Sequence, residues 1–342
     1  MEKTILKTGL EDLNFNLETH YLDAIESKWY QMLCLLQDEI NHATYSFFRG
    51  KGIKSVSLPI TTGSVTSPMG LGSDSLPVKI NLEGEETYLS DSMQFHLEYA
   101  IRLLKNGTHY VMPSFRGEKA DKRHLCQFYH SEAEIPGKLD DVISLVNQYI
   151  LFLCNHIIQN IKEDLSDFTG DISHIDKFIE LGGNIPRITF NEACKLLDYD
   201  KRYVSIHPEG FRTINSEGEK KLIEHFGGFV WLTHHDYKSV PFYQDHDETG
   251  SQALNADLLF GIGEVVGAGQ RHVDDQGLLN AMNMLNVNPE EYQWYLEMKK
   301  RYPMITSGFG MGIERFILWV LKHDDIRDCQ LIPRFNGITI NP

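Results

Sequence analysis

The chain has 342 residues, 42% of them hydrophobic and 23% charged, and its 48 acidic residues outnumber its 32 basic residues to give a formal net charge of −16. That composition belongs to a globular protein with one large domain or two ordinary ones. The acidic balance argues against extensive RNA binding, because phosphate contacts need a basic surface.

Cysteines and apolar segments indicate the compartment. The 5 cysteines are scattered, odd in number and without a CxxC pair, so neither a disulfide framework nor a zinc site is expected. Residues 1–16 lack the apolar core of a signal peptide. The most apolar helical segment, residues 142–161, contains Asn147, Gln148 and Asn155, which disfavours a transmembrane span. We therefore expect a cytoplasmic protein.

The first 75 residues predict a helix, a strand and a loop. Helical spacing over residues 20–50 places one apolar stripe on Trp29, Met32, Leu33, Leu36 and Ile40. Residues 53–60 alternate as a strand does, with Pro59 tolerable only at an edge or a strand end. Residues 61–75 are rich in Gly, Ser and Thr. We interpret them as a flap over a substrate, although structural filler is nearly as good an interpretation.

Further along, one long helix is predicted with a purely structural role. Residues 142–161 carry an apolar stripe at helical spacing behind Asp140 and Asp141, which suit a helix N-terminus. Residues 182–184 and 244–252 predict turns or loops. Because neither a linker nor an internal repeat is evident, we predict a single domain.

Two distant segments carry the strongest functional signal. Residues 308–312 read Gly-Phe-Gly-Met-Gly and lead through Glu314 and Arg315 into an apolar segment. Such glycines, Gly310 and Gly312 in particular, let a ligand approach the backbone closely, although alone they could equally form a turn. Upstream, residues 115–118 read Phe-Arg-Gly-Glu and precede an aromatic Phe128. Two arginines, an aromatic ring and a glycine floor are what a nucleoside triphosphate site needs.

The upstream segment resembles motif 2 of class II aminoacyl-tRNA synthetases, and the downstream one resembles motif 3. Residues 257–271 are similar to the aspartyl/asparaginyl subgroup, and residues 89–98, 185–190 and 288–295 are similar to the asparaginyl enzymes. The resemblance runs from about residue 26 to the C-terminus. It implies an α/β (α+β) fold, a class II synthetase-like antiparallel sheet flanked by helices.

The resemblance also implies a domain organisation and an assembly. Residues 20–60 resemble motif 1, which forms the dimer interface of the family, so a homodimer is expected. We expect residues 1–25 to form an N-terminal extension and residues 26–342 the catalytic domain. The anticodon-binding barrel of the subgroup has five strands, which about 25 residues cannot build, so we expect it to be missing.

Roles at the nucleotide follow from the resemblance. Arg116 and Arg315 are implied as the catalytic arginines, and Arg116 would contact the α-phosphate and the substrate carboxylate. Glu118 would accept a hydrogen bond from the adenine amino group. Phe128 would stack on one face of the base and Arg315 on the other.

The triphosphate end has two further groups of implied residues. Arg123 and His124 would reach the γ-phosphate from a loop that is one residue shorter than in the asparaginyl pattern. Asp257 and Glu264 match the Mg²⁺ ligands of the family, and Mg²⁺ typically takes one or two carboxylates plus phosphates. By spacing alone these two carboxylates would be read as solvated surface groups. Gly267 replaces a serine that some relatives use as a further ligand.

The amino-acid pocket is implied by three residues. Gln94 matches the glutamine that holds the α-amino group, and Arg271 the arginine that reads the side chain. Leu97 stands where the aspartyl enzymes carry a lysine for the substrate β-carboxylate, which favours asparagine or a similar side chain over aspartate. His272 replaces a glutamate of the asparaginyl enzymes, so we expect the pocket to be altered there.

Three functions remain open. In the first, the chain uses ATP and Mg²⁺ to form an aminoacyl-adenylate and passes the amino acid to ammonia or a small amine, as an asparagine-synthetase-like enzyme or amide ligase. In the second, it is a truncated asparaginyl-tRNA synthetase that charges tRNA. In the third, it is a non-catalytic sensor of adenylate or amino acid. The acidic charge and the expected absence of the barrel favour the first, with tRNA not expected as a partner.

Overall fold

The computed structural model describes residues 19–66, 71 and 75–340. Most of the predicted N-terminal extension and the middle of the predicted flap therefore lie outside the described residues.

An 8-stranded sheet forms the centre of the described structure. In spatial order its strands are β1 (Lys54–Ser55), β5 (Thr108–Phe115), β6 (Gln127–Pro136), β13 (Thr306–Gly312), β12 (Gly263–Gln270), β11 (Asn255–Phe260), β10 (Val230–Thr233) and β7 (Arg187–Thr189). Neighbouring strands are antiparallel, except that the edge strands β1 and β7 pair in parallel with β5 and β10. The predicted antiparallel sheet is confirmed.

Helices and two small sheets surround this centre. The helices are α1 (His20–Glu26), α2 (Lys28–Gly50), α3 (Gln94–Leu104), α4 (Leu139–Thr169), α5 (Ser173–Glu180), α6 (Phe190–Leu196), α7 (Ser216–His225), α8 (Asp275–Met284), α9 (Gln293–Arg301) and α10 (Ile313–Val320), with 3₁₀ turns η1 (Tyr237–Ser239), η2 (Pro289–Tyr292) and η3 (Ile326–Cys329). The small sheets consist of β2 (Thr61–Thr62), β4 (Glu85–Leu89) and β3 (Val78–Leu82), and of β8 (Val204–Ile206) and β9 (Arg212–Ile214).

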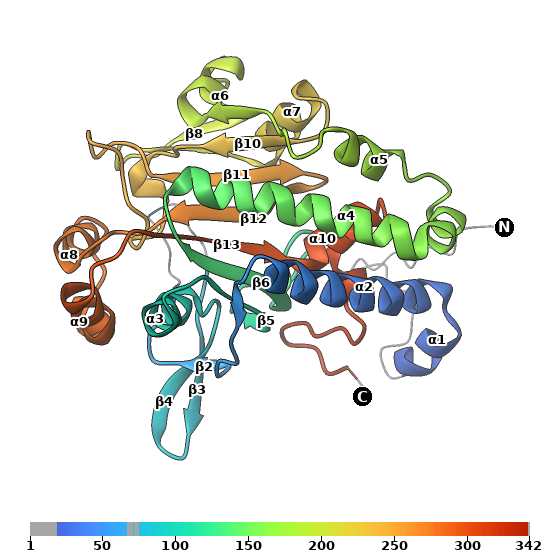
Figure 1. Cartoon of the computed structure of the whole chain (residues 1–342), viewed down its shortest axis with the longest axis horizontal. Coiled ribbons are helices and arrows are strands. Elements are labelled where there is room, and N and C mark those ends of the chain that lie inside the picture. The colour runs from blue at the N-terminus through green and yellow to red at the C-terminus, as the bar shows by residue number, and fades with distance from the viewer. Residues whose placement is uncertain (1–18, 67–70, 72–74, 341–342) are drawn as a thin grey trace.

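Helices α2 and α4 lie side by side across one face of the central sheet (Figure 1). The predicted stripe of α2 is confirmed, because Met32, Leu33, Leu36 and Ile40 are buried. The helix begins after residue 27, since Ser27 is extended and its hydroxyl accepts a hydrogen bond from the next turn of backbone. The predicted single helix is thus divided into α1 and α2.

The predicted core helix is α4. Among the described residues it is the one helix long and apolar enough to cross a membrane by length and composition, with a mean hydropathy of 1.3. Its buried side chains, which include Val142, Val146, Tyr149 and Leu153, pack against α2 and the sheet. The helix therefore covers the sheet, as its periodicity predicts.

The predicted strand over residues 53–60 is wrong beyond its first residues. Strand β1 covers only Lys54–Ser55, and the Val56 N–H still donates to the His109 carbonyl at 3.0 Å. Pro59 has no N–H to continue the ladder, so the edge strand stays short.

Candidate functional site

Strand β13 carries the Gly-x-Gly-x-Gly run and leads directly into the buried helix α10, as the sequence predicts. Its glycines admit two carboxylates from the neighbouring strand β6. A Cβ at Gly308 would overlap Glu134 Oε2, and one at Gly310 would stand 3.1 Å from Glu132 Oε1. The glycine floor predicted for a ligand is therefore partly covered by the protein's own acids, which the sequence did not predict.

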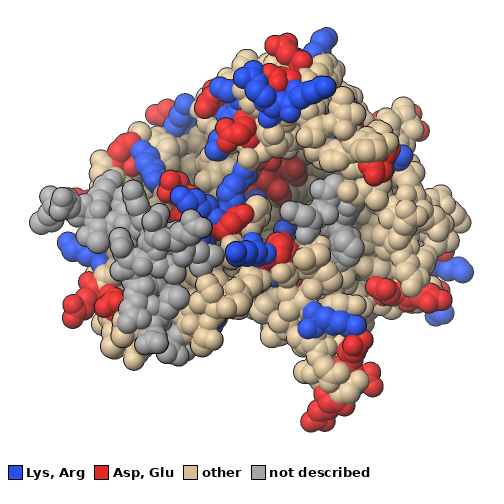
Figure 2. Space-filling model, turned by 180° about the vertical axis from the view of Figure 1, so that it is seen from behind, with Lys and Arg blue, Asp and Glu red and all other residues tan. Residues whose placement is uncertain are grey.

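Figure 2 shows the face opposite α2 and α4, which is hollowed, with acidic side chains deep in the hollow and basic ones beside it. A cavity of about 110 Å³ lies between β6, β12, β13 and α10. It is lined by every predicted ATP-binding residue, namely Arg116, Glu118, Arg123, His124, Phe128, Gly310, Gly312 and Arg315. Glu264 of the predicted metal pair lines it too, so segments far apart in the sequence meet here.

The two arginines predicted to be catalytic, Arg116 and Arg315, approach the cavity from different elements. The Arg116 guanidinium lies 5.6 Å from the centre of the Phe128 ring, a cation–π contact that the sequence did not predict. Arg315 instead donates to the Glu264 carbonyl at 2.5 Å, and burial lowers the pKa of its guanidinium. Arg116 Nε is buried and has no hydrogen-bond partner among the described residues. A sandwich of the base between Phe128 and Arg315 stays a prediction.

Glu118 joins the cavity to the end of the predicted flap. Its Oε2 accepts a hydrogen bond from the Leu76 N–H at 3.0 Å, and the Gly117 N–H donates to the Leu76 carbonyl at 2.7 Å. Its Oε1 lies 3.8 Å from Arg116. The carboxylate predicted to read adenine is therefore held in place from both sides, while its contact with adenine stays a prediction.

Arg123 and His124 both reach the cavity but bind different acids. Arg123 Nη2 donates to Glu219 Oε2 at 3.2 Å, and its buried Nε finds no hydrogen-bond partner in the described part of the chain. The half-exposed His124 ring lies 3.1 Å from Asp121. Buried guanidinium N–H groups without acceptors are costly unless an anion satisfies them, so Arg116 and Arg123 both point to an anionic ligand.

The predicted metal carboxylates converge where β11 and β12 pair. A Cβ placed on Gly267 would stand 2.8 Å from Glu264 Oε1 and 3.8 Å from Asp257 Oδ1. Burial, followed by the charge of Glu264, raises the pKa of Asp257 well above its usual range. His235 Nε2 lies 3.3 Å from Asp257, and burial lowers the pKa of that ring to about 4, so the imidazole is neutral at pH 7.

This donor set fits Mg²⁺. Two partly buried carboxylate groups that repel each other are the environment that a divalent cation stabilises, and phosphate oxygens and water would complete its coordination. Within the described residues no group of three or more His, Cys, Asp and Glu side chains is arranged to hold a metal without such help.

At the amino-acid end, buried ion pairs surround Arg271. Its Nε and Nη2 each donate to a Glu134 carboxylate oxygen at 3.0 Å. Glu98 accepts a hydrogen bond from Lys299 at 2.8 Å and another from Tyr295. The arginine predicted to read the substrate side chain is therefore already neutralised by the protein.

Gln94, at the start of α3, hydrogen-bonds the Tyr243 hydroxyl. Leu97 is fully buried in an apolar cluster with Met93 and Tyr110, so no cation stands at this position. The roles of both residues in binding an amino acid stay predictions.

His272 turns away from the neighbouring Arg271. Its Nε2 lies 3.0 Å from the Tyr237 hydroxyl and its Nδ1 lies 3.2 Å from Asp245. A Cβ on Gly277, in α8, would stand 2.9 Å from its Nδ1. The altered pocket predicted from this replacement stays a prediction.

Sequence reasoning missed several members of the site. Glu132 accepts hydrogen bonds from Ser92, at 2.7 Å, and from Tyr110, and burial raises its pKa to about 7. His130 lies 3.2 Å from Glu132, and burial, followed by the charge of Arg116, lowers its pKa to about 3. A signal was present, because residues 130, 132 and 134 alternate along one strand and share a face.

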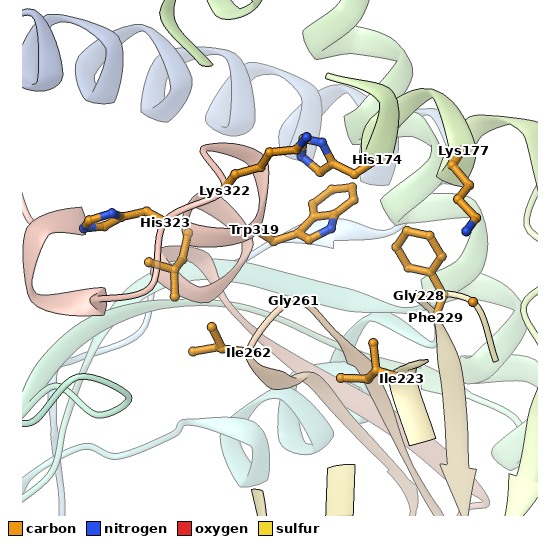
Figure 3. Close-up of a pocket in the computed structure, with 12 residues that line it drawn as sticks. His174, Lys177, Ile223, Gly228, Phe229, Gly261, Ile262, Trp319, Lys322 and His323 are labelled. Carbon is orange, nitrogen blue, oxygen red and sulfur yellow. The ribbon is translucent and has the colours of Figure 1, made fainter. Parts of the chain in front are cut away.

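A larger hollow of about 400 Å³ lies elsewhere. Figure 3 shows its labelled side chains, which include His174, Lys177, Phe229 and Trp319 around the turn at Gly261. None of the residues predicted for catalysis or binding lines it. Size alone therefore does not locate the chemistry of this chain.

An antiparallel sheet with arginines, paired carboxylates and a glycine strand around one cavity defines a class II synthetase-like catalytic domain. The family model for class II tRNA synthetases (D, K and N) matches residues 12–336. The chain belongs to this family.

Individual relatives agree with that assignment. The chain is 31% identical over 261 residues to an asparagine–tRNA ligase of Pyrococcus furiosus, covering 75% of this chain and 58% of the relative, so it spans little more than half of that protein. The crystal structure of asparaginyl-tRNA synthetase from Pyrococcus horikoshii complexed with asparaginyl-adenylate matches with a TM-score of 0.86 at 26% identity, over 98% of this chain and 74% of that one. The Entamoeba histolytica enzyme with the same adenylate gives 0.79 at 20% identity, over 97% and 72%, which shows the shared fold.

Proposed function

We propose that the chain binds ATP with Mg²⁺ and activates the α-carboxylate of an amino acid as an aminoacyl-adenylate. One observation carries the proposal. Arg116 and Arg123 each have a buried Nε without an acceptor, and both line a cavity that also holds Glu264 of the carboxylate pair. The two arginines can donate hydrogen bonds to the oxygens of a triphosphate. The neighbouring acidic pair can bind the divalent cation that accompanies it. The asparaginyl-adenylate in the two related structures supports the same reaction class.

Different residues would bind the substrate carboxylate and the triphosphate, the two anions that react. Arg116 would contact both the attacking carboxylate and the α-phosphate, offsetting their repulsion and the charge of the pentavalent transition state. Arg315 closes the opposite wall, and Arg123 would receive the γ-phosphate that departs within pyrophosphate. Asp257 and Glu264 would hold Mg²⁺, which when bound neutralises phosphate charge.

The activated amino acid should carry a neutral side chain such as that of asparagine. Glu134 neutralises Arg271 through two hydrogen bonds of 3.0 Å, and Glu132 lies on the same strand face. A substrate carboxylate would face these two acids, and the guanidinium of Arg271 is already paired with Glu134. A carboxamide can accept from the remaining guanidinium N–H groups without adding charge.

For the acceptor we propose ammonia or a small amine, which makes the chain an amide ligase. The support is the formal charge of −16, which disfavours a polyanionic partner. A second candidate acceptor is tRNA, which the names of the related ligases favour. Both reactions begin with the same activation step and differ only in the molecule that receives the amino acid.

ATP–pyrophosphate exchange over a panel of amino acids tests the activation step. We expect exchange with asparagine or a related neutral amino acid, and a loss of about two to three decades in Arg116→Ala. Arg202→Ala is the matched control, because Arg202 is exposed, forms its ion pair with the neighbouring Asp200 and lines neither cavity. Full exchange in Arg116→Ala would refute the assignment.

Product analysis tests the acceptor. Incubation with ATP, the activated amino acid and ammonia, amines or total tRNA is followed by mass spectrometry and by acid precipitation of charged tRNA. A free amide or amino-acid conjugate would support the proposal. Saturable aminoacylation at physiological salt would establish tRNA as the acceptor.

A further inference from the structure

Helix α9 carries a lysine that is fully buried, although the next residue of the helix is an exposed lysine. The side chain of Lys299 has no exposed surface, whereas Lys300 faces solvent. Lys299 Nζ donates to Glu98 Oε2 at 2.8 Å and to the carbonyl of His272 at 2.6 Å. This side chain therefore joins α3 to the residue that follows Arg271.

The same carboxylate is also connected to the backbone N–H of Arg271. Glu98 Oε2 accepts a hydrogen bond from the Thr306 hydroxyl at 3.3 Å, and the Thr306 carbonyl accepts one from the Arg271 N–H at 2.9 Å. Regular pairing between β12 and β13 ends one residue earlier, at Gln270. The backbone that presents Arg271 is thus fixed at its N–H through Thr306 and at the next carbonyl through Lys299.

Stability alone does not explain this network. Burying an ammonium and a carboxylate is costly, and apolar residues of similar size often replace such a pair without loss of stability. The hydrogen bond to the His272 carbonyl is the contact that an apolar pair could not supply. Because Glu98 directly follows Leu97 in α3, the network also fixes Arg271 relative to the helix of the predicted amino-acid pocket.

We propose that Lys299 is a positioning residue of the amino-acid pocket, which fixes the backbone beside Arg271 through the carbonyl of His272. The inference rests on the proposed function, in which Arg271 reads the side chain of the amino acid. Two hydrogen bonds of 3.0 Å align its guanidinium with Glu134. A shift of this backbone would displace the N–H groups that remain for the substrate. Lys299 itself lines neither cavity.

Pyrophosphate exchange in two variants tests this role. Lys299→Met keeps the length of the side chain and removes both of its hydrogen bonds. The double variant Glu98→Gln/Lys299→Met also removes the charge of the carboxylate, which would otherwise stay buried without its ammonium. In both, the KM for the activated amino acid should rise by about 10- to 100-fold, because a misplacement of about 1 Å can have an effect of that size. The KM for ATP should stay unchanged, since no member of the network lines the nucleotide cavity.

Two further variants separate positioning from packing. Lys300→Met is the matched control, because it makes the same substitution at the exposed next position of α9. Lys299→Arg keeps a positive charge and N–H donors for the His272 carbonyl, so it should recover much of the affinity for the amino acid that Lys299→Met loses. Circular dichroism and urea unfolding measure the fold and the stability of each variant.

The outcomes separate the two proposals. A rise in the KM for the amino acid alone, reversed by Lys299→Arg, would support the positioning role. If the folded double variant keeps the wild-type KM, or if the values for ATP and the amino acid rise equally, the role of Lys299 is refuted while the proposed function stands. If the wild type exchanges with no amino acid, the proposed function and the role of Lys299 are both refuted.

Discussion

Replacing Glu134 with glutamine should shift the amino-acid preference towards aspartate. The carboxylate of Glu134 neutralises Arg271 through two hydrogen bonds of 3.0 Å. Glutamine has nearly the same shape and keeps one acceptor oxygen, but it leaves the guanidinium charge uncompensated. A substrate β-carboxylate can then take the place of the lost charge.

The size of the shift follows from the electrostatics. Two carboxylates that share one guanidinium lie roughly 5 Å apart, and at an effective dielectric constant of about 20 they repel by about 3 kcal/mol. Removing this repulsion should change the ratio of aspartate to asparagine activation by about two decades. The buried arginine also loses a partner, so the free energy of unfolding should fall by about 1–3 kcal/mol.

Pyrophosphate exchange measures the effect as the ratio of kcat/KM for aspartate to kcat/KM for asparagine. Glu297→Gln is the control, because Glu297 is exposed and pairs with Arg301 on the surface of α9. An unchanged ratio in a folded Glu134→Gln protein would show that Arg271 does not read the side chain. A wild type that exchanges with aspartate alone would refute the inferences from both Glu134 and Leu97.

Three further predictions concern stability and assembly. Gly308→Ala should displace Glu134 and destabilise the protein by about 1–3 kcal/mol in urea unfolding, whereas Gly50→Ala, which has open space around it, should not. Glu132 has a pKa raised to about 7, so its stabilising contribution is complete below about pH 4.5 and is lost as the pH rises through 7. Glu132→Gln should therefore flatten the fall in unfolding free energy between these pH values, and an unchanged slope would contradict the assignment. Light scattering should show a homodimer, and a monomer at micromolar concentration would contradict the motif 1 resemblance.

The sheet and the long helices could be predicted because their signals are local. The periodicity of α2 and α4 and the glycine run of β13 are each visible within one segment, and the resemblance placed them in one fold. The length of strand β1 was overestimated because the alternation of apolar and polar residues continues past Val56. Pairing with β5 also needs backbone N–H donors, and Pro59 has none.

The residues that line the cavity could be predicted where they belong to a recognised motif. Residues that contact them from other elements could not. Glu219 is one of several acids on α7, and nothing in its spacing separates it from the solvated Glu217. Its ion pair with Arg123 depends on tertiary structure, which brings α7 close to the turn at Gly263. Likewise, the hydrogen bonds of Glu134 required the register between β6 and β13, which the sequence does not reveal.

The position of β13 in the sheet also bears on how the protein is made. Strand β13 lies between β6 and β12, yet among the described residues it is the last strand in chain order. A nascent chain on the ribosome therefore holds two unjoined partial sheets, with β6 and β12 as open edges, until residues 306–312 emerge. Open strand edges are sites of aggregation, and pairings between distant segments form slowly. The cavity between β6, β12, β13 and α10 should therefore form only after residues 306–312 have been translated.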